Sequence, residues 1–379
     1  MVASQSQARS SVTSIDDVGL VVDADSHLTE SVDDLYPYMD DRDEGIKQLI
    51  KLSEIPFSDI FSITAPTPIF PDGQDEGTAD VDLWSGANDI EGKHDLMDEY
   101  GIDHSIVNPT LVAVVNTVNN SRIARALVSA YNRYLIDNFA DSDRISNIMV
   151  VAPHEPNRAA EEIDEWADED SVVGVLIPPA GLVPAAGDRR YDPIYEAAQR
   201  HDLPVHYHSN TGAVHRSFPM QHNWSQTYAE EHAIMHPFTH MWNLSSLLFN
   251  GTPERFPDVE FVFNEAGIGW IPYMTWRLDD HYLELPHDVP VLEKLPSEYI
   301  SDQFYFTTQP LGHTARDGRH IAQIIEMIGP DSVMYSADLP HPDFDLPAEL
   351  FDRIRSQFDD EAVEKIMGKN AADLFGIEA

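Results

Sequence analysis

The stretch Val21-Val22-Asp23-Ala24-Asp25-Ser26-His27-Leu28-Thr29-Glu30 guides the interpretation of the whole chain. Residues 20–24 are mostly apolar and β-branched, a pattern that predicts a short buried strand. Asp25 and His27 are two residues apart, so in an extended chain both side chains point the same way as the strand ends. A carboxylate beside an imidazole suits a divalent ion such as zinc or manganese. From this stretch alone, Asp25 capping a turn and His27 lying on the surface remain the alternative.

Composition makes the chain strongly acidic. Its 379 residues include 66 Asp and Glu against 23 Lys and Arg, a net charge of −43. The acids are scattered along the chain, which predicts an acidic shell and adaptation to a high-salt interior. This charge argues against nucleic-acid partners, which bind basic patches, and against anionic membranes. The chain has no cysteine, so disulfides and thiolate-held metals are excluded.

The beginning of the chain predicts a tail followed by one domain. Residues 1–16 are expected to be a disordered tail, because this end is rich in Ser, Gln and Ala and has no apolar signal-peptide core. No apolar run is long enough to span a membrane, so we expect a cytoplasmic protein. Residues 17–379 are predicted to form the single domain. Within it, residues 31–90 have little periodicity and predict a lid-like insertion. Its aromatic residues line a pocket or pack the insertion down: Phe57, Phe61, Phe70 and Trp84.

Strand-like runs alternate with helix-like runs along the chain. Eight such strands with helices between them predict a closed (β/α)8 TIM barrel, with an open doubly wound sheet as the alternative. No glycine-rich phosphate loop follows the first strand, which disfavours the open sheet. The predicted strands are 20–24, 105–109, 147–151, 172–177, 203–208, 259–264, 304–307 and 333–337.

Acidic and imidazole side chains stand at the ends of several predicted strands. In a barrel of parallel strands these ends meet at one face, where an Asp-His-His-Asp set can enclose one metal ion and leave a position for water or substrate. The residues are Asp25 and His27 after the first strand, His206 and His208 in the fifth, Glu265 after the sixth, and Asp338 and His341 after the eighth.

These motifs together resemble the amidohydrolase superfamily, in the branch that includes 2-amino-3-carboxymuconate-6-semialdehyde decarboxylase and γ-resorcylate decarboxylase. The resemblance implies that Asp25, His27, His208 and Asp338 are metal ligands. Glu265 stands where the semialdehyde decarboxylase has a histidine, so an acid–base role and a structural role are both open. The resemblance extends through Asp23–His27, Gly174–Pro178, Leu203–His208, Phe256–Trp270, Trp276–Asp279, Leu295–Glu298, Tyr335–His341 and Gly368–Phe375.

The lack of a lysine on the fourth predicted strand bears on the number of metal ions. Two-metal members of the superfamily commonly use a carboxylated lysine on the fourth strand, whereas here that strand ends in Pro178-Pro179 and no lysine lies between Lys93 and Lys294. One divalent ion is therefore predicted. Zinc is the first choice for mixed nitrogen and oxygen ligands, and manganese is the second because two carboxylates favour a harder ion.

Several secondary residues are candidates for substrate binding. Arg277 lies in a segment from which decarboxylases recruit an arginine, and it either binds a substrate carboxylate or forms a structural salt bridge. His206 and His341 are further candidates. His206 is alternatively a metal ligand or a core residue, and His341 is also placed to support a ligand. His232, His236 and His240 recur every fourth residue. This spacing predicts one helix face that lines the pocket or a dimer contact, with a second metal site as the weakest alternative.

Three functions remain open from the sequence. The resemblance favours a decarboxylase of a small carboxylated, aromatic or unsaturated compound, in which Asp338 or Glu265 moves a proton and His208 belongs to the reacting centre. Hydrolysis of a lactone or amide is the close alternative, with a metal-bound water and Asp338 as base. A barrel that binds a ligand without catalysis is the third. A homodimer is implied by the resemblance.

Overall fold

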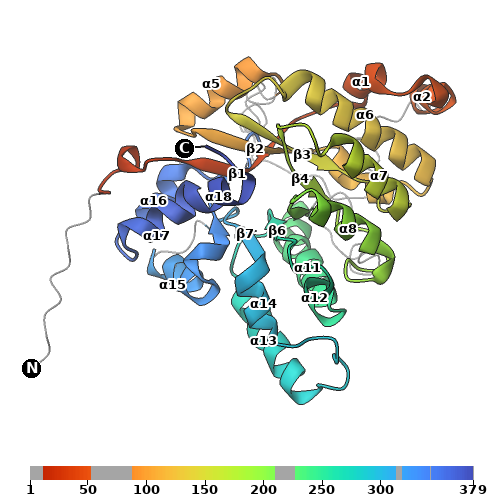
Figure 1. Ribbon diagram of the computed structural model, residues 1–379. Coiled ribbons are helices and arrows are strands. Elements are labelled where there is room, and N and C mark those ends of the chain that lie inside the picture. Colours follow the sequence, from red (N-terminus) through yellow and green to blue (C-terminus); the bar gives the residue numbers. More distant parts are fainter. Residues whose placement is uncertain (1–11, 53–87, 210–226, 313–317, 342, 379) are drawn as a thin grey trace, which may run out of the picture.

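The computed structural model describes residues 12–52, 88–209, 227–312, 318–341 and 343–378. Its centre is a parallel sheet of eight strands in the order β1-β2-β3-β4-β5-β6-β7-β8, surrounded by helices (Figure 1). The predicted (β/α)8 barrel is confirmed, and the open doubly wound alternative is wrong. The strands are β1 (Val22–His27), β2 (His104–Asn108), β3 (Ile145–Val150), β4 (Val172–Leu176), β5 (Val205–His208), β6 (Phe261–Asn264), β7 (Phe304–Thr307) and β8 (Val333–Met334).

The seam between the first and last strands brings two of the predicted ligands together. Strand β8 is shorter than predicted, but the chain after it continues beside β1. The amide of Ala24 donates to Tyr335 O at 3.0 Å, the amide of Asp338 to Asp25 O at 2.8 Å, and the amide of His27 to Leu339 O at 2.8 Å. Closure of the sheet therefore holds Asp25 and Asp338 side by side although they are more than 300 positions apart in the sequence.

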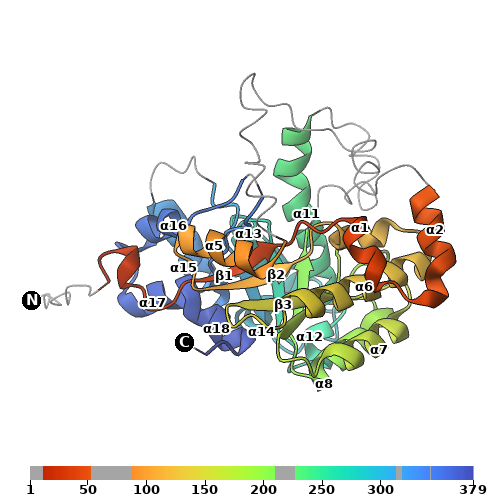
Figure 2. The ribbon, with the colours of Figure 1, turned by 90° about the horizontal axis from the view of Figure 1, so that it is seen from above.

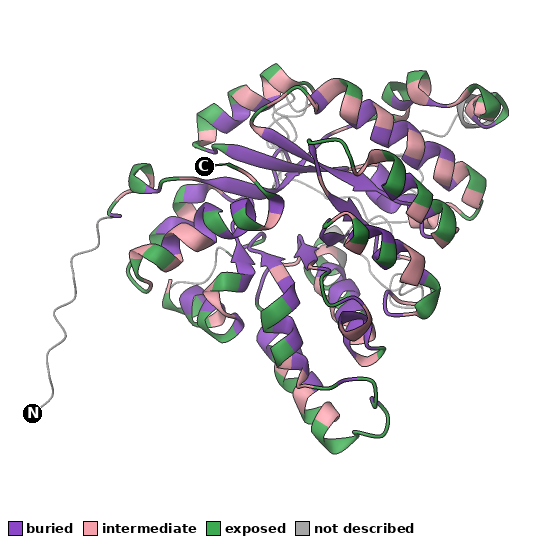
Figure 3. Ribbon diagram, in the orientation of Figure 1, coloured by how far each residue is buried: buried purple, intermediate pink, exposed green. Residues whose placement is uncertain are grey.

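Amphipathic helices cover the outside of the barrel. The strands are almost entirely buried, whereas the helices are buried on the inner face and exposed on the outer face (Figure 3). Helix α6 (Ser121–Phe139) illustrates the local signals, because the Asn120 side chain caps its first turn and its buried face carries Ala124, Leu127 and Leu135. The other outer helices are α7 (Pro156–Trp166), α8 (Asp192–Arg200), α12 (Thr252–Arg255), α13 (Ile271–Glu284), α14 (Pro296–Gln303), α15 (Arg319–Ile328), α16 (Pro347–Ile354), α17 (Asp360–Glu364) and α18 (Asn370–Phe375).

The structure describes the last residues of the predicted tail, from residue 12 onward. Val12 is buried in the core and Ile15–Asp17 form a 3-10 helix, with Asp17 accepting hydrogen bonds from Thr13. The predicted insertion starts with α1 (Val32–Leu35) and α2 (Glu44–Leu52), and its last residues begin α5 (Ile90–Tyr100). The four aromatic residues that were expected to line its pocket lie outside the described residues. The lid and the single-domain boundaries stay predictions.

Helix α11 (Tyr228–Phe249) occupies the long excursion after β5. Thr227 caps its first turn by accepting a hydrogen bond from the Glu230 amide. In Figure 2 its N-terminal half rises above the strands. The helix therefore places its histidines beside the carboxyl ends of β5 and β6. None of the helices in the described parts of the chain is long and apolar enough to cross a membrane.

Candidate active site

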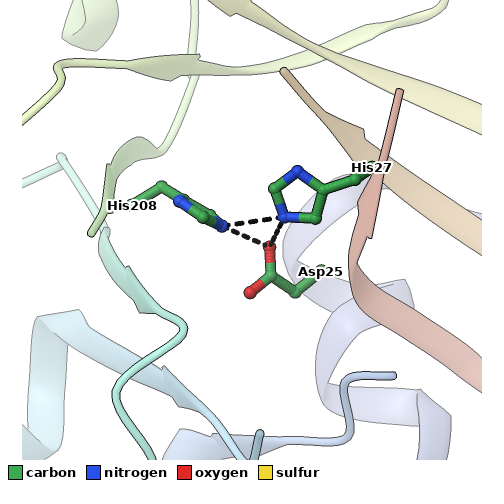
Figure 4. A group of neighbouring side chains, drawn as sticks. All are labelled: Asp25, His27 and His208. Carbon is green, nitrogen blue, oxygen red and sulfur yellow. Dashed lines mark hydrogen bonds and ion pairs between the residues drawn. The ribbon is translucent and has the colours of Figure 1, made fainter. Parts of the chain in front are cut away.

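Four buried side chains gather where β1, β5 and β8 end. The Nε2 atoms of His27 and His208 lie 2.9 Å apart, and Asp25 Oδ1 lies 3.6 Å and 3.3 Å from them, respectively. Asp338 Oδ1 lies 3.3 Å from His27 Nε2. Figure 4 shows the Asp25 carboxylate and the two imidazoles pointing toward one another. The structure therefore brings together the four residues that the sequence placed at strand ends.

The cluster has the size and the chemistry of a divalent-metal site. Ligand atoms about 2.0–2.2 Å from a tetrahedral zinc ion lie about 3.3–3.6 Å apart, close to three of the four separations above. Asp25 Oδ2 and Asp338 Oδ2 are buried and have no hydrogen-bond partner among the described residues. Buried polar atoms are normally paired. These residues thus fit a metal ion, which would satisfy the charges that burial leaves uncompensated.

Comparison with known proteins gives the family. The family described as "Amidohydrolase" matches residues 22–377. The chain belongs to the amidohydrolase family. It is therefore an enzyme of the amidohydrolase superfamily, as the strand-end motifs predicted.

Relatives and solved structures of this family cover most of the chain. A γ-resorcylate decarboxylase from Rhodococcus jostii (strain RHA1) is 25% identical over 300 residues, which are 75% of this chain and 86% of the relative. An amidohydrolase from Mycobacterium avium subsp. paratuberculosis K-10 has a similar fold, with a TM-score of 0.73, 20% identity and coverage of 94% and 99%. A dihydroxybenzoic acid decarboxylase from Polaromonas sp. JS666, solved with manganese and the inhibitor 2-nitroresorcinol, has a TM-score of 0.67, 20% identity and coverage of 95% and 98%.

Polar residues around the amidohydrolase cluster fix its side chains. Asn108 Nδ2 donates to Asp25 Oδ1 at 3.0 Å, and His341 Nδ1 donates to Asp338 Oδ1 at 2.7 Å. The Thr110 hydroxyl lies 3.2 Å from His341 Nε2 and 3.4 Å from His27 Nδ1. Such partners fix the orientation of metal-binding side chains. Asn108 and Thr110 were not among the predicted site residues. Asn108 lies near the end of the second predicted strand and Thr110 directly after it, so strand-end position was the signal that could have found them.

Asp23 lies one layer deeper in the barrel than Asp25. Its Oδ1 accepts hydrogen bonds from the amides of Ala337 at 2.7 Å and Asp25 at 3.1 Å, so it links the start of β1 to the segment after β8. Burial raises the pKa of Asp23 to about 7, although the two amide bonds oppose the shift. Asp23 was not among the predicted site residues, and the alternation Asp23, Asp25, His27 was the signal that could have found it.

Lys93 is a buried cation beneath the cluster. Its side chain comes from α5 and is 1% exposed, and Nζ donates to Ser26 Oγ at 2.8 Å and to Leu339 O at 3.4 Å. Burial lowers the pKa of Lys93 to about 8, against the attraction of Asp23 and Asp338. Lys93 therefore contributes positive charge where the structure concentrates carboxylates. Its position within an ordinary helical pattern gave no sign of this.

Two acidic residues of the site have an unusual backbone. Glu265 has φ 55° and Asp338 has φ 64°, the left-handed region that non-glycine residues rarely adopt. Each such residue costs on the order of 1–3 kcal/mol and persists where surrounding structure enforces it, often at functional sites. Here the Asp338 amide bonds to β1 and the Glu265 amide donates to Thr307 Oγ1 at 3.3 Å. The two turns direct both carboxylates toward the imidazole cluster. Glu265 Oε2 lies 3.5 Å from His208 Nε2, and Asp338 Oδ1 lies 3.3 Å from His27 Nε2.

Burial and like charges shift the acids of the site toward the protonated form. Burial, and then the negative charges of Asp343 and Asp25, raise the pKa of Asp338 well above its ordinary value. Burial, and then the negative charge of Asp338, raise the pKa of Glu265 well above its ordinary value. Burial alone would also raise the pKa of Asp25, but His208 and His27 outweigh it and lower that pKa. The site thus holds one firmly ionised carboxylate beside two that can carry protons.

The structure separates three other predicted residues from the cluster. Arg277 lies on the exposed face of α13, where its guanidinium is 3.3 Å from His281 Nε2, because Leu278 takes the buried face of that helix. His206 lies deeper in the barrel than His208, bonded to Asn264 Oδ1 at 3.3 Å through Nδ1. His240 donates from Nε2 to the main-chain oxygen of Asn264 at 2.6 Å, which is a structural contact.

Proposed function

We propose that this amidohydrolase is a metal-dependent decarboxylase of a small carboxylated aromatic compound. The observation that carries the proposal is the buried cluster at the ends of β1, β5 and β8, whose separations suit one divalent ion. The activities named for the Rhodococcus and Polaromonas relatives support the choice of decarboxylation over hydrolysis. Asp25, His27, His208 and Asp338 would hold the ion. Zinc suits the mixed ligands, and the manganese in the Polaromonas structure supports the second choice.

The chain's own acids supply the proton that the reaction requires. Loss of carbon dioxide from an aromatic carboxylate replaces the carbon–carbon bond by a carbon–hydrogen bond, so one proton must reach the ring carbon. A bound divalent ion supplies Lewis acidity that holds the substrate's oxygens and stabilises negative charge. Asp338 and Glu265 are the buried carboxyl groups that reach the cluster, and one of them would deliver that proton. His341 orients Asp338 through the 2.7 Å bond from Nδ1.

Substrate recognition is assigned to residues at the rim of the cluster. His341 is 16% exposed at its side chain and contacts both Asp338 and Thr110, so it is placed to meet a ligand entering from the open face. His206, which is bonded to Asn264 Oδ1 deeper in the barrel, is not part of this rim. We propose that Arg277 acts across a homodimer contact, because its helix carries the exposed aromatic side chains of Tyr273 and Trp276, which are 55% and 60% exposed. Sedimentation of Trp276→Glu against the native chain tests the dimer.

A carbon dioxide assay tests the reaction. The metal-free full chain would be loaded with Zn²⁺ or Mn²⁺ in high salt and incubated with 2,6-dihydroxybenzoate, 5-carboxyvanillate and aryl esters. We expect trapped carbon dioxide from at least one acid, lost in His208→Asn and kept in His287→Gln, which changes an exposed histidine. Ester cleavage with no carbon dioxide from any acid would refute decarboxylation. No metal-dependent activity and less than one bound ion per chain would favour a ligand-binding barrel.

We propose that the acidic surface serves a high-salt cytoplasm. The end of α7 and the turn after it illustrate the shell, with exposed side chains at Glu165, Asp168, Glu169 and Asp170. Neighbouring acids repel one another at low ionic strength, and salt screens that repulsion. We expect the melting temperature to rise steadily from low to molar potassium chloride. A melting temperature independent of salt would contradict the proposal.

A further inference from the structure

The ring of His27 meets different groups at its two nitrogens. Nε2 faces the cluster, 2.9 Å from His208 Nε2 and 3.3 Å from Asp338 Oδ1. Figure 4 shows the other ring nitrogen, Nδ1, pointing away from Asp25 and His208. Nδ1 lies 3.4 Å from the Thr110 hydroxyl. Because an imidazole binds a metal ion through a nitrogen that carries a lone pair, Nε2 has to be unprotonated and the ring proton has to stand on Nδ1.

The hydrogen bonds of the Thr110 hydroxyl then have one direction. The hydroxyl accepts from His27 Nδ1, and its own proton is left for His341 Nε2 at 3.2 Å. The other end of the series requires the same direction, because His341 donates from Nδ1 to Asp338 Oδ1 at 2.7 Å and a neutral ring then has its lone pair on Nε2. The bonds therefore run from His27 through Thr110 and His341 to Asp338, and both ends are predicted metal ligands.

A buried carboxylate fixes the backbone of Thr110. Glu30 lies three residues after His27 and is 5% exposed. Its Oε2 accepts a hydrogen bond from the Thr110 amide at 3.2 Å, and its Oε1 accepts from the amides of Leu111 at 2.8 Å and Val112 at 3.0 Å. These amides stand at the start of the 3-10 helix that begins at Val112, which has no side-chain cap from Leu111.

The origin of the Glu30 carboxylate matters more than the capping itself. A Ser or Asp within the loop after β2 would satisfy helix-terminal amides equally well. Glu30 comes instead from the chain that follows β1, the strand that carries His27. Its three bonds therefore tie the position of the Thr110 hydroxyl to the strand whose imidazole that hydroxyl contacts.

We propose that Glu30 and Thr110 are positioning residues of the metal site. Glu30 fixes the backbone of Thr110, and the Thr110 hydroxyl selects the form of His27 that presents Nε2 to the ion and the form of His341 that holds Asp338. This inference rests on the metal site of the proposed function and adds two residues that do not bind the ion themselves. Partners of this kind change metal affinity about 10–100-fold.

Zn²⁺ affinity of the full chain tests the role of the hydroxyl. Metal-free protein in high salt would compete for Zn²⁺ with a chelator. We expect Thr110→Val, which keeps the side-chain shape, to weaken binding about 10–100-fold, and Thr110→Ser to restore most of it. Glu30→Gln leaves at least one of the three amides without an acceptor and should weaken binding about tenfold. The matched control Thr275→Val removes a half-buried hydroxyl that donates to Ile271 O on α13 and should bind as the native chain does.

A double variant and a spectrum distinguish positioning from general stability. If Glu30 acts through Thr110, Glu30→Gln combined with Thr110→Val should bind Zn²⁺ no more weakly than Thr110→Val alone, whereas independent losses would multiply. In the native chain, long-range ¹H–¹⁵N spectra of ¹⁵N-labelled histidines should show the His341 proton on Nδ1. The His341→Gln spectrum identifies that signal by its loss.

Several results would overturn the proposal. They are native Zn²⁺ affinity in Thr110→Val, multiplied losses in the double variant, a proton on His341 Nε2, and a native chain that binds no Zn²⁺. None of these measurements uses a substrate. A chain that shows the expected affinities but releases no carbon dioxide would therefore refute the proposed decarboxylation and support the roles of Glu30 and Thr110.

Discussion

Replacing Lys93 by methionine is the sharpest test of how the barrel tolerates its buried carboxylates. The substitution keeps the length and the apolar stem but removes the charge and the hydrogen bonds to Ser26 Oγ and Leu339 O. Lys93 lies within the electrostatic reach of Asp23 and Asp338, and the whole group is buried. Removing one partner from a buried charge group costs about 3–5 kcal/mol. At about 2.1 cal/mol/K of unfolding entropy per residue, this predicts a melting temperature lower by roughly 4–6 °C.

Whether the loss of melting temperature in Lys93→Met depends on metal shows if Lys93 stabilises the fold by compensating buried negative charge or only by packing. Thermal unfolding would be measured for the native chain, Lys93→Met and Lys365→Met, each with chelator and with Zn²⁺. Lys365 is the matched control, because it pairs with Asp331 at 2.7 Å on the surface and its loss should cost at most about 1 kcal/mol. Added Zn²⁺ brings positive charge to the same carboxylates, so it should narrow the gap between Lys93→Met and the native chain. An unchanged melting temperature for metal-free Lys93→Met, or a gap unaffected by Zn²⁺, would refute the reasoning.

Three further predictions follow from single residues. Asp338→Asn removes a ligand and a proton donor, so kcat for carbon dioxide release should fall by about 10²–10⁴-fold, and a native rate would exclude Asp338 from the chemistry. Gly174→Ala should destabilise the barrel by about 1–3 kcal/mol in urea unfolding, because its Cβ would lie 2.8 Å from His206 Nε2, whereas Gly269→Ala, with open space, should cost less. Burial, and then Arg144, lower the pKa of His104 to about 4. Protonation therefore favours the unfolded chain, and stability should fall by up to about 3 kcal/mol from pH 6.5 to pH 4; His104→Gln should remove this part of the pH dependence.

The strand ends were predictable because side-chain alternation is a local property. Asp25 and His27 face the same way in any extended chain, and a polar residue directly after a buried apolar run lies at a strand end whatever the fold. The order of apolar runs and helices then indicated the barrel, and the barrel places all such ends on one face. Those two steps nominated seven strand-end residues, and the family resemblance then implied that Asp25, His27, His208 and Asp338 among them are the ligands.

The sequence alone determined the acidic character, the order of strands and helices and the strand-end position of the candidate ligands, because each depends on composition or on a local pattern, and the motifs shared with the family indicated which four of them cluster. Only the tertiary structure decided the burial of Lys93, the outward direction of Arg277 and the position of Glu265 beside histidines of β5 and α11. These depend on how α5, α13 and α11 pack against the barrel and on a left-handed turn after β6. Contacts between distant elements carry no local pattern, so they become visible only when the sheet closes.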